Sequence, residues 1–336
     1  MTAEPITIGN KALTLAKAVK EPQFRMKTVL TLDPFDYVDL WLRREHKDEA
    51  LHYWRQARTF HRAASGLPIE SAPLVLYYCF MNAAKALLSS KGITFNPYHG
   101  VGPHRIRVPN SRIMLSNEGI AIKTNGIVPA LITYFGEAEP SKQHSLEEVL
   151  YNLVYIHRTY CLSYARKKER FIPLKGTSFL RDSVSGEVRL HAEIVDNIDW
   201  TFYRKHLPRE VGATSGGNPS IHSISSINWT TLDNPTVAEL TALCQLNAQL
   251  RRVFHYINGA HTLWYLKTTG SYEIDRMPIT LPLSAMHRLS AICRYKPSPL
   301  QSYLDGQTHW LLSEFVATAP SQLLDAAARA LSGPHI

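Results

Sequence analysis

The chain has no long hydrophobic run and no apolar segment at its start, and both absences limit where it can reside. The most apolar stretch, APLVLYYCFMNAAKALL, is interrupted by Asn82 and Lys85. It is shorter than the roughly 18 continuous apolar residues that a spanning helix needs. The first residues, MTAEPITIGNKALTLAKAVK, contain Glu4 and lack the apolar centre of a signal peptide. We therefore expect a cytoplasmic protein without a membrane partner.

Cysteine is scarce, and no two cysteines are spaced as a CxxC pair. The four cysteines are far apart, each in an apolar context: Cys79, Cys161, Cys244 and Cys293. Their spacing predicts four free thiols and no structural zinc, although two disulfides remain the alternative in an oxidising compartment. The glycines do not form a phosphate-binding loop after a strand, so we expect no cofactor.

The recognised motifs of hydrolases and nucleotide-binding enzymes are also missing: GxSxG, HExxH and Walker A. Whether the protein is an enzyme is therefore uncertain from its sequence. What the sequence does have is a basic excess, with 37 Lys and Arg against 28 Asp and Glu and a net charge of +9. Such an excess is typical of proteins that bind nucleic acid or an acidic partner.

Helical signals dominate the first third of the chain. Asp33 followed by Pro34 predicts a helix start, and that helix extends to about Arg44. Apolar residues at helical spacing predict two further helices, over about 46–63 and 71–91. Their short Gly-Pro link predicts an antiparallel hairpin whose buried residues are Trp54, Phe60, Leu74, Tyr78 and Met81.

The rest of the chain contains both helix and strand signals. Asn117-Glu118-Gly119 predicts a hairpin turn between two short strands, and Ser145 opens a predicted helix that ends at about Lys168. A leucine stripe predicts a helix over about 236–257, and a helical block begins near Leu283. The fold predicted from this order is mainly α within the α+β class, a helical bundle with a β-containing middle insertion. The predicted segments are an N-terminal arm (1–33), a helical region with a small hairpin (34–168), a β- and loop-rich insertion (169–234) and a C-terminal helical region that packs on the first (235–336).

Two stretches carry a family resemblance. The first is HYWRQARTFHRAASGLPIESAPLVLYYCFMNAAKALLSSKG followed by YHGV, and the second is PLSAMHRLSAICRYKPSPLQSYLDGQTHWLLSEFVATAPS. Together they are similar to the N- and C-terminal patterns of the bacterial YaaC-like family, a resemblance that implies no particular activity. The first helix pair also resembles the core hairpin of HEPN domains, which occur in toxins, ribonucleases and defence proteins.

The HEPN resemblance implies a catalytic Arg followed after four to six residues by His, because a cation holds the phosphate while an imidazole moves a proton. Arg55 and His61 have this spacing, but on a regular helix they point about 120° apart. Arg252 and His255 lie at i and i+3 on a predicted helix face. For both pairs we prefer a structural role.

The best candidate surface is a nucleic-acid contact rich in cations and histidines. Its first part begins in the YHGV segment and continues after it, and its second part ends the helix predicted from Ser145. The residues are His99, His104, Arg105, Arg107, Arg112, Arg166, Lys167 and Lys168. Metal binding at the two histidines lacks a third ligand at suitable spacing, and a structural turn is the alternative interpretation.

Three functions therefore remain open. The favoured hypothesis is a protein that binds nucleic acid or a partner protein, in bacterial defence or stress. The alternatives are a HEPN-type ribonuclease and a non-catalytic assembly scaffold that binds no nucleic acid. We expect the chain to associate with a partner protein or with copies of itself as a homo-oligomer.

Overall fold

The computed structural model describes residues 3–26, 29, 31, 33–106, 113–164, 167–195, 198–214, 218–230 and 235–333. The chain forms two compact units. Unit 1 contains residues 1–30, 170–271 and 333–336, and unit 2 contains residues 31–169 and 272–332. Each unit is thus assembled from separated stretches of the chain, whereas the four predicted segments are consecutive.

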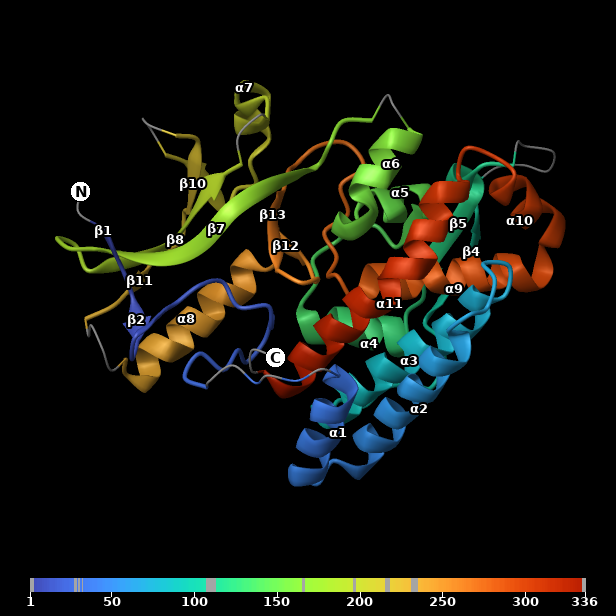
Figure 1. Cartoon of the computed structure of the whole chain (residues 1–336), viewed down its shortest axis with the longest axis horizontal. Coiled ribbons are helices and arrows are strands. Elements are labelled where there is room, and N and C mark those ends of the chain that lie inside the picture. Colours follow the sequence, from blue (N-terminus) through green and yellow to red (C-terminus); the bar gives the residue numbers. More distant parts are fainter. Residues whose placement is uncertain are drawn as a thin grey trace. The chain divides into compact units, whose positions relative to one another are not determined.

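Unit 1 is built on an antiparallel sheet that has eight strands within the described residues (Figure 1). The path runs β12-β13-β7-β8-β10-β9, with β1 paired to β7 and β11 to β8. Its strands are β1 (Ala3–Pro5), β7 (Phe171–Asp182), β8 (Glu187–Ile194), β9 (Val211–Ala213), β10 (Ser220–Ser223), β11 (Ile227–Asn228), β12 (Phe254–Ile257) and β13 (Leu263–Lys267). The remaining elements of the unit are β2 (Thr7–Ile8), β3 (Lys11–Ala12), α7 (Trp200–Tyr203) and α8 (Val237–Leu250).

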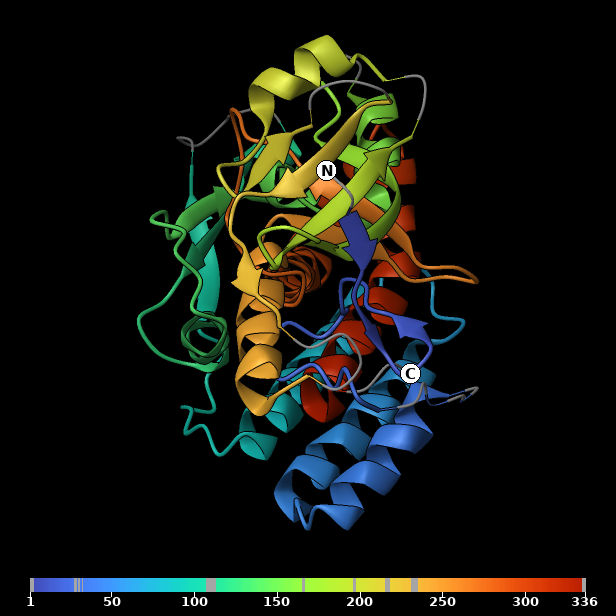
Figure 2. The ribbon, with the colours of Figure 1, turned by 90° about the vertical axis from the view of Figure 1, so that its left-hand side faces the viewer.

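The core of unit 1 lies on one face of this sheet. In β8 the side chains of Val188, Leu190, Ala192 and Ile194 are buried, whereas the residues between them are half-buried or exposed, as the two-residue period of a strand requires. Helix α8 covers the apolar face together with the N-terminal segment, as Figures 1 and 2 show. This burial explains why the N-terminal segment is ordered although it has little regular structure.

Unit 2 combines helices with a three-stranded sheet. The helices are α1 (Pro34–Arg44), α2 (Asp48–Ala64), α3 (Ala72–Ser90), α4 (Ile127–Phe135), α5 (Leu146–Tyr151), α6 (His157–Ser163), α9 (Thr280–Tyr295), α10 (Pro297–Leu304) and α11 (His309–Ser332). The strands β4 (Val101–Arg105), β5 (Glu118–Ile122) and β6 (Gln143–Ser145) pair in that order. Helix α3 contacts α2, α9 and α11, and its residues are mostly buried. No helix in the described part of the chain is long and apolar enough to cross a membrane.

The first helices agree with the sequence-based expectation. Helix α1 begins at Pro34, and the Asp33 carboxylate accepts a hydrogen bond from the Phe35 amide at 2.8 Å. Helices α2 and α3 form the predicted hairpin. Of the five residues predicted to be buried in it, Trp54 and Met81 are buried and the other three are half-buried.

The predicted fold class is wrong, because the protein is a mixed α+β structure and not a helical bundle with a β insertion. The main sheet recruits β1 from the N-terminal segment and β12 and β13 from the region predicted to be helical. The helix expected to continue to Ile257 ends at Leu250. Its aromatic continuation FHYI is a strand that pairs with LWYLK, since aromatic and β-branched residues favour extended structure when a neighbouring strand is available.

Two local predictions in unit 2 also need correction. The helix that opens at the Ser145 capping box stops at Tyr151, where the Asn152 side chain donates to the backbone oxygens of Glu148 and Tyr272. The turn expected at Asn117-Glu118-Gly119 is instead the start of β5. The partner of β5 is β4, so the segment around His104 and Arg105, for which a structural turn was the alternative interpretation, is a strand.

Candidate functional site

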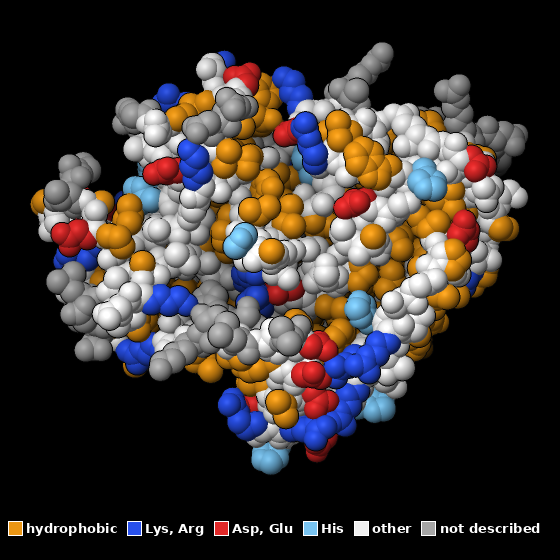
Figure 3. Space-filling view, in the orientation of Figure 1, with side chains coloured by type: hydrophobic (Ala, Val, Ile, Leu, Met, Phe, Trp, Pro, Cys, Tyr) orange, Lys and Arg blue, Asp and Glu red, His pale blue; other side chains and the backbone are white. Residues whose placement is uncertain are grey.

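Arg55 and His61, the first pair considered for catalysis, lie on α2 and serve the packing of α1 on α2. The Arg55 guanidinium donates to Asp39 at 2.5 Å, and burial lowers the pKa of His61, whose ring packs against Phe35. Arg58 pairs with Asp36 and Asp33. Figure 3 shows the resulting mixture of acidic and basic side chains over α1 and α2. The charges of Arg55 and Arg58 are therefore balanced by acidic neighbours, and these side chains are not available to bind a phosphate.

Arg252 and His255 are placed differently from the expectation of a shared helix face. His255 lies in β12, is 2% exposed, and has its Nε2 3.2 Å from the backbone oxygen of Arg252. Burial holds the pKa of His255 well below its usual value, and the charges of Lys267 and Arg251 act in the same direction. A buried neutral imidazole bonded to a backbone carbonyl has a structural role.

The predicted nucleic-acid surface is only partly described. Arg107, Arg112 and Arg166 lie outside the described residues. His99 precedes β4, His104 and Arg105 end it, and Lys167 and Lys168 follow α6. Arg105 and Lys168 are exposed, and the Lys167 ammonium lies 3.6 Å from the centre of the Tyr272 ring.

The two parts of that surface approach one another at a pocket of about 220 Å³. Ile106, which follows Arg105, lines the pocket together with Lys167. The lining also includes the carboxylates of Glu147 and Glu148, which disfavour a phosphate inside the pocket.

A different group of side chains in unit 2 has the composition of a functional site. Tyr77 on α3, His99 before β4 and His287 on α9 pack ring against ring. The ring centres are 5.3 Å apart for Tyr77 and His99, 5.0 Å for Tyr77 and His287, and 5.3 Å for the two histidines. The Tyr77 hydroxyl is hydrogen-bonded to Nδ1 of His99 and lies 3.4 Å from Sδ of Met81. We call Tyr77, His99 and His287 the Tyr-His-His cluster.

The backbone around His99 is fixed from two sides. The Ile127 amide at the start of α4 donates to the Tyr98 carbonyl at 2.9 Å, and the Lys123 amide donates to the Gly100 carbonyl at 2.9 Å. Gly100 has a φ of +73°, and a Cβ atom there would lie 2.3 Å from Cδ of Pro129. Only glycine fits this turn, which explains the Gly in the YHGV segment.

The electrostatic environment keeps both imidazoles neutral near pH 7. Burial lowers the pKa of His99, and the charges of Arg294 and Lys85 lower it further. Burial also lowers the pKa of His287 to about 4, with His99, Arg294 and Arg288 acting in the same direction. Burial raises the pKa of Tyr77 well above its usual value, and Arg294 opposes that shift. Arg294 is thus within electrostatic range of all three members of the cluster.

His287 has an unused polar atom. Its side chain lies on a buried stretch of α9 and is 7% exposed, and its Nδ1 atom has no hydrogen-bond partner within the described structure. Buried polar atoms in folded proteins are nearly always hydrogen-bonded. A buried nitrogen without a hydrogen-bond partner, next to a second imidazole, is a place where a water or a ligand group can bind.

Lys85 and Arg294 beside the cluster lack acidic partners among the residues that the structure describes. The Lys85 ammonium lies 5.2 Å from the centre of the Tyr53 ring, and partial burial lowers its pKa. The Arg294 guanidinium is exposed and lies 5.0 Å from the centre of the Tyr295 ring. Cations held against aromatic rings without a carboxylate remain available for an anion.

The buried acids of unit 2 are, by contrast, fully engaged. Glu118 receives hydrogen bonds from Arg288, Lys296 and Tyr303. Glu137 is paired with Arg276 at 3.1 Å and also accepts from Thr280 at 2.5 Å. These networks tie β5 to α9 and α10, and the segment before α9 to the end of α4. They stabilise unit 2, and the carboxylates of Glu118 and Glu137 are already bonded within the protein.

Sequence reasoning singled out His99 but missed Tyr77, His287 and Arg294. Tyr77 is 22 positions from His99, and the other two lie about 190 positions further along the chain, so no spacing rule connects them. A signal was nevertheless present, because all four residues fall within the two stretches that carry the family resemblance. Among the described residues, no group of three His, Cys, Asp or Glu side chains is arranged to hold a metal ion.

A family model described as YaaC-like Protein matches residues 15–331. The chain belongs to the YaaC-like family. This match covers the Tyr-His-His cluster and most of each unit. It does not extend to HEPN domains, and the HEPN resemblance of the first helix pair is not supported. No curated protein and no solved structure matches the chain.

Proposed function

We propose that this YaaC-like protein binds a nucleic-acid strand, with a backbone phosphate at the Tyr-His-His cluster. The proposal is supported by Lys85 and Arg294, which have no acidic partner among the described residues and which both lower the pKa of the same imidazole, His99. Two cations beside the cluster are a suitable set for a phosphate diester, which carries one negative charge and two free oxygens.

The aromatic residues around these cations support a nucleic acid over a simple anion. Tyr98 is 67% exposed next to His99, and Tyr295 is 73% exposed next to Arg294. Exposed rings beside phosphate contacts provide surfaces on which unpaired bases stack, at about 1–3 kcal/mol per base. The site thus favours a single strand, in which the bases are accessible.

The cations at the end of β4 and after α6 extend the same proposal. Arg105 and Lys168 are exposed, and contacts of this type bind the phosphate backbone without reading its sequence. We expect them to contribute to affinity but to be less important than the cluster, because Glu147 and Glu148 line the pocket that Ile106 and Lys167, their neighbours in the chain, also line.

The test is equilibrium binding of a fluorescent 20-nucleotide single strand, as RNA and as DNA. Lys85→Gln combined with Arg294→Gln should weaken binding roughly tenfold or more, because the loss of even one charge-assisted contact costs about 1.5–3 kcal/mol. Lys47→Gln combined with Arg44→Gln removes two exposed cations of α1 and α2 and should leave binding within about threefold of wild type.

A protein-binding scaffold is the competing function. Wild-type protein that binds neither strand at low ionic strength would support the scaffold and end the nucleic-acid proposal. Equal binding by the cluster variant and its control would place the contact elsewhere on the molecule.

A further inference from the structure

The hydrogen bonds of the cluster determine which nitrogen of His99 carries a proton. The Tyr77 oxygen contacts both Sδ of Met81 and Nδ1 of His99. A thioether sulfur can only accept, so the tyrosine hydrogen points to Met81 in this hydrogen bond. Both contacts are then satisfied in one way, with Nδ1–H of His99 donating to the tyrosine oxygen. This tautomer leaves Nε2 of His99 with a free lone pair.

His99 therefore has the arrangement of an oriented general base. One nitrogen is anchored by a buried hydroxyl, and the other carries a lone pair on a side chain that is more than a third exposed. Its pKa lies below the ordinary value because of burial and the neighbouring cations, so the base is unprotonated at neutral pH. No other histidine among the described residues combines such an anchor with two unpaired cations.

We propose that His99 removes the proton from a ribose 2′-hydroxyl, so that the protein cleaves single-stranded RNA by transesterification at the Tyr-His-His cluster. This inference rests on the proposed function, because the strand must first bind. The substrate class is then single-stranded RNA, and the nucleophile is the ribose 2′-hydroxyl.

The step balances with groups that the described structure supplies. The 2′-oxygen forms a bond to the adjacent phosphorus while its proton moves to Nε2 of His99. The bond from phosphorus to the 5′-oxygen breaks, and that oxygen leaves with the electron pair and takes a proton from the Lys85 ammonium. Arg294 donates to the phosphoryl oxygens as negative charge accumulates there. The products are a 2′,3′-cyclic phosphate and a 5′-hydroxyl, and water returns the two side chains to their starting protonation.

Lys85 suits the acid role because partial burial lowers its pKa, which makes proton release easier. His287 does not, because it is buried and neutral. Its ring packs on both Tyr77 and His99, so His287 is a positioning residue that fixes the orientation of the base.

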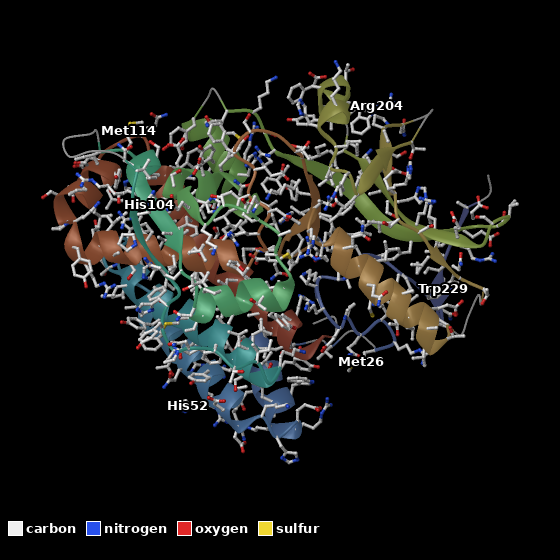
Figure 4. All side chains as sticks on the ribbon, turned by 180° about the vertical axis from the view of Figure 1, so that it is seen from behind. Met26, His52, His104, Met114, Arg204 and Trp229 are labelled. Atoms are coloured by element: carbon white, nitrogen blue, oxygen red, sulfur yellow. The ribbon has the colours of Figure 1, made fainter. Side chains whose placement is uncertain are left out.

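The experiment follows binding and cleavage of the same 5′-labelled 20-nucleotide RNA in one sample, in the presence of EDTA. Wild-type protein should cut the RNA, leave cyclic phosphate ends, and bind but not cut the matching DNA. His99→Ala should lower the cleavage rate roughly 100-fold or more while DNA binding changes by less than about fivefold. His52→Ala, on α2 and away from β4 (Figure 4), is the matched control and should cut like wild type.

The variant Tyr77→Phe distinguishes a role of Tyr77 in orienting His99 from a role in folding. It removes the acceptor for Nδ1–H, so it should lower kcat roughly tenfold, leave KM nearly unchanged and alter the acidic limb of the pH profile.

Binding without cleavage would overturn this inference and leave the proposed function standing. Absence of binding would end both. Cleavage that survives in His99→Ala would overturn the role of His99.

Discussion

At the scale of single residues, the protein distinguishes cations that stabilise the fold from cations that remain available. Arg276 and Arg288 are buried against Glu137 and Glu118, and Arg329 is paired with Asp325 one helical turn away. Removing one partner of such a buried pair leaves an uncompensated charge, so these arginines are structural. Lys85 and Arg294 have aromatic neighbours instead of acids. That difference, rather than the net charge of the chain, identifies the candidate site.

The buried imidazole of His287 predicts acid sensitivity. Its pKa falls from an ordinary 6.5 in the unfolded chain to about 4 in the folded state, so below pH 6.5 the unfolded state binds the proton first. Stability should therefore be lost as the pH falls from 6.5 to 4, by about 3 kcal/mol from this group. His287→Gln should reduce the difference between the unfolding free energies at pH 7 and pH 4.5, measured with urea. An unchanged pH dependence relative to wild type would contradict the assignment, and His52→Ala should leave it unchanged.

At the scale of elements, local signals were reliable where the physics is local. Asp33 and Pro34 identified the start of α1 because capping depends on neighbouring residues. The Ser145 capping box identified the start of α5, but not its end at Tyr151, because Asn152 bonds to the carbonyl of Tyr272 far along the chain.

Non-local pairing explains the larger errors. Strands β12 and β13 exist because β7 offers them a neighbour, and a leucine stripe that leads into FHYI gives no sign of that neighbour. The candidate site has the same property. The sequence could suggest His99 from its Gly-rich surroundings, but its contact with Tyr77 and His287 depends on how α3, α9 and the segment before β4 pack.

The attachment of the N-terminal segment to α8 gives a prediction at this scale. Asn247 is 0% exposed, accepts from the Ala16 amide at 2.9 Å and donates to the Ala18 carbonyl at 2.8 Å. Asn247→Ala leaves two buried backbone groups unpaired and should lower the unfolding free energy by roughly 2–4 kcal/mol. Asn228→Ala, at an exposed strand position, should change it by less than about 0.5 kcal/mol. The free energies are measured by urea unfolding followed by circular dichroism. If both substitutions lowered the unfolding free energy to a similar extent, the attachment would contribute nothing to stability.

At the scale of the whole molecule, the two units differ in what they offer for function. Unit 1 surrounds a core of sheet, α8 and N-terminal segment, and its most buried cations bond to backbone carbonyls, as Arg170 and Arg251 do. Unit 2 contains the Tyr-His-His cluster together with Lys85 and Arg294, which have no acidic partner in the part of the chain that the structure describes. Family membership spans both units, so it does not by itself assign the function to either.

The thiols give a prediction for the whole chain. All four cysteines are free, and burial raises the pKa of Cys79 to about 12 and those of Cys161 and Cys293 to about 11. Few thiolates form at pH 8, so iodoacetamide should react slowly with the native protein and with Cys79 last, and fully with four thiols after unfolding. The mass under non-reducing conditions should be that of the reduced chain. A mass lower by two hydrogens would reveal a disulfide and contradict this account.

The central claim is that phosphate binds at the Tyr-His-His cluster, and the salt dependence of strand binding tests it most directly. Each phosphate contact releases about 0.7 counterions from a single strand, so the slope of log K against log salt counts the contacts. We predict that Lys85→Gln with Arg294→Gln lowers this slope by roughly one to two units for RNA and DNA alike. Changing Arg105, Arg107 and Arg112 to Ala together should lower it by a smaller amount. A cluster variant that keeps the wild-type slope and affinity, while the triple variant loses both, would contradict the account and move the binding site to the end of β4.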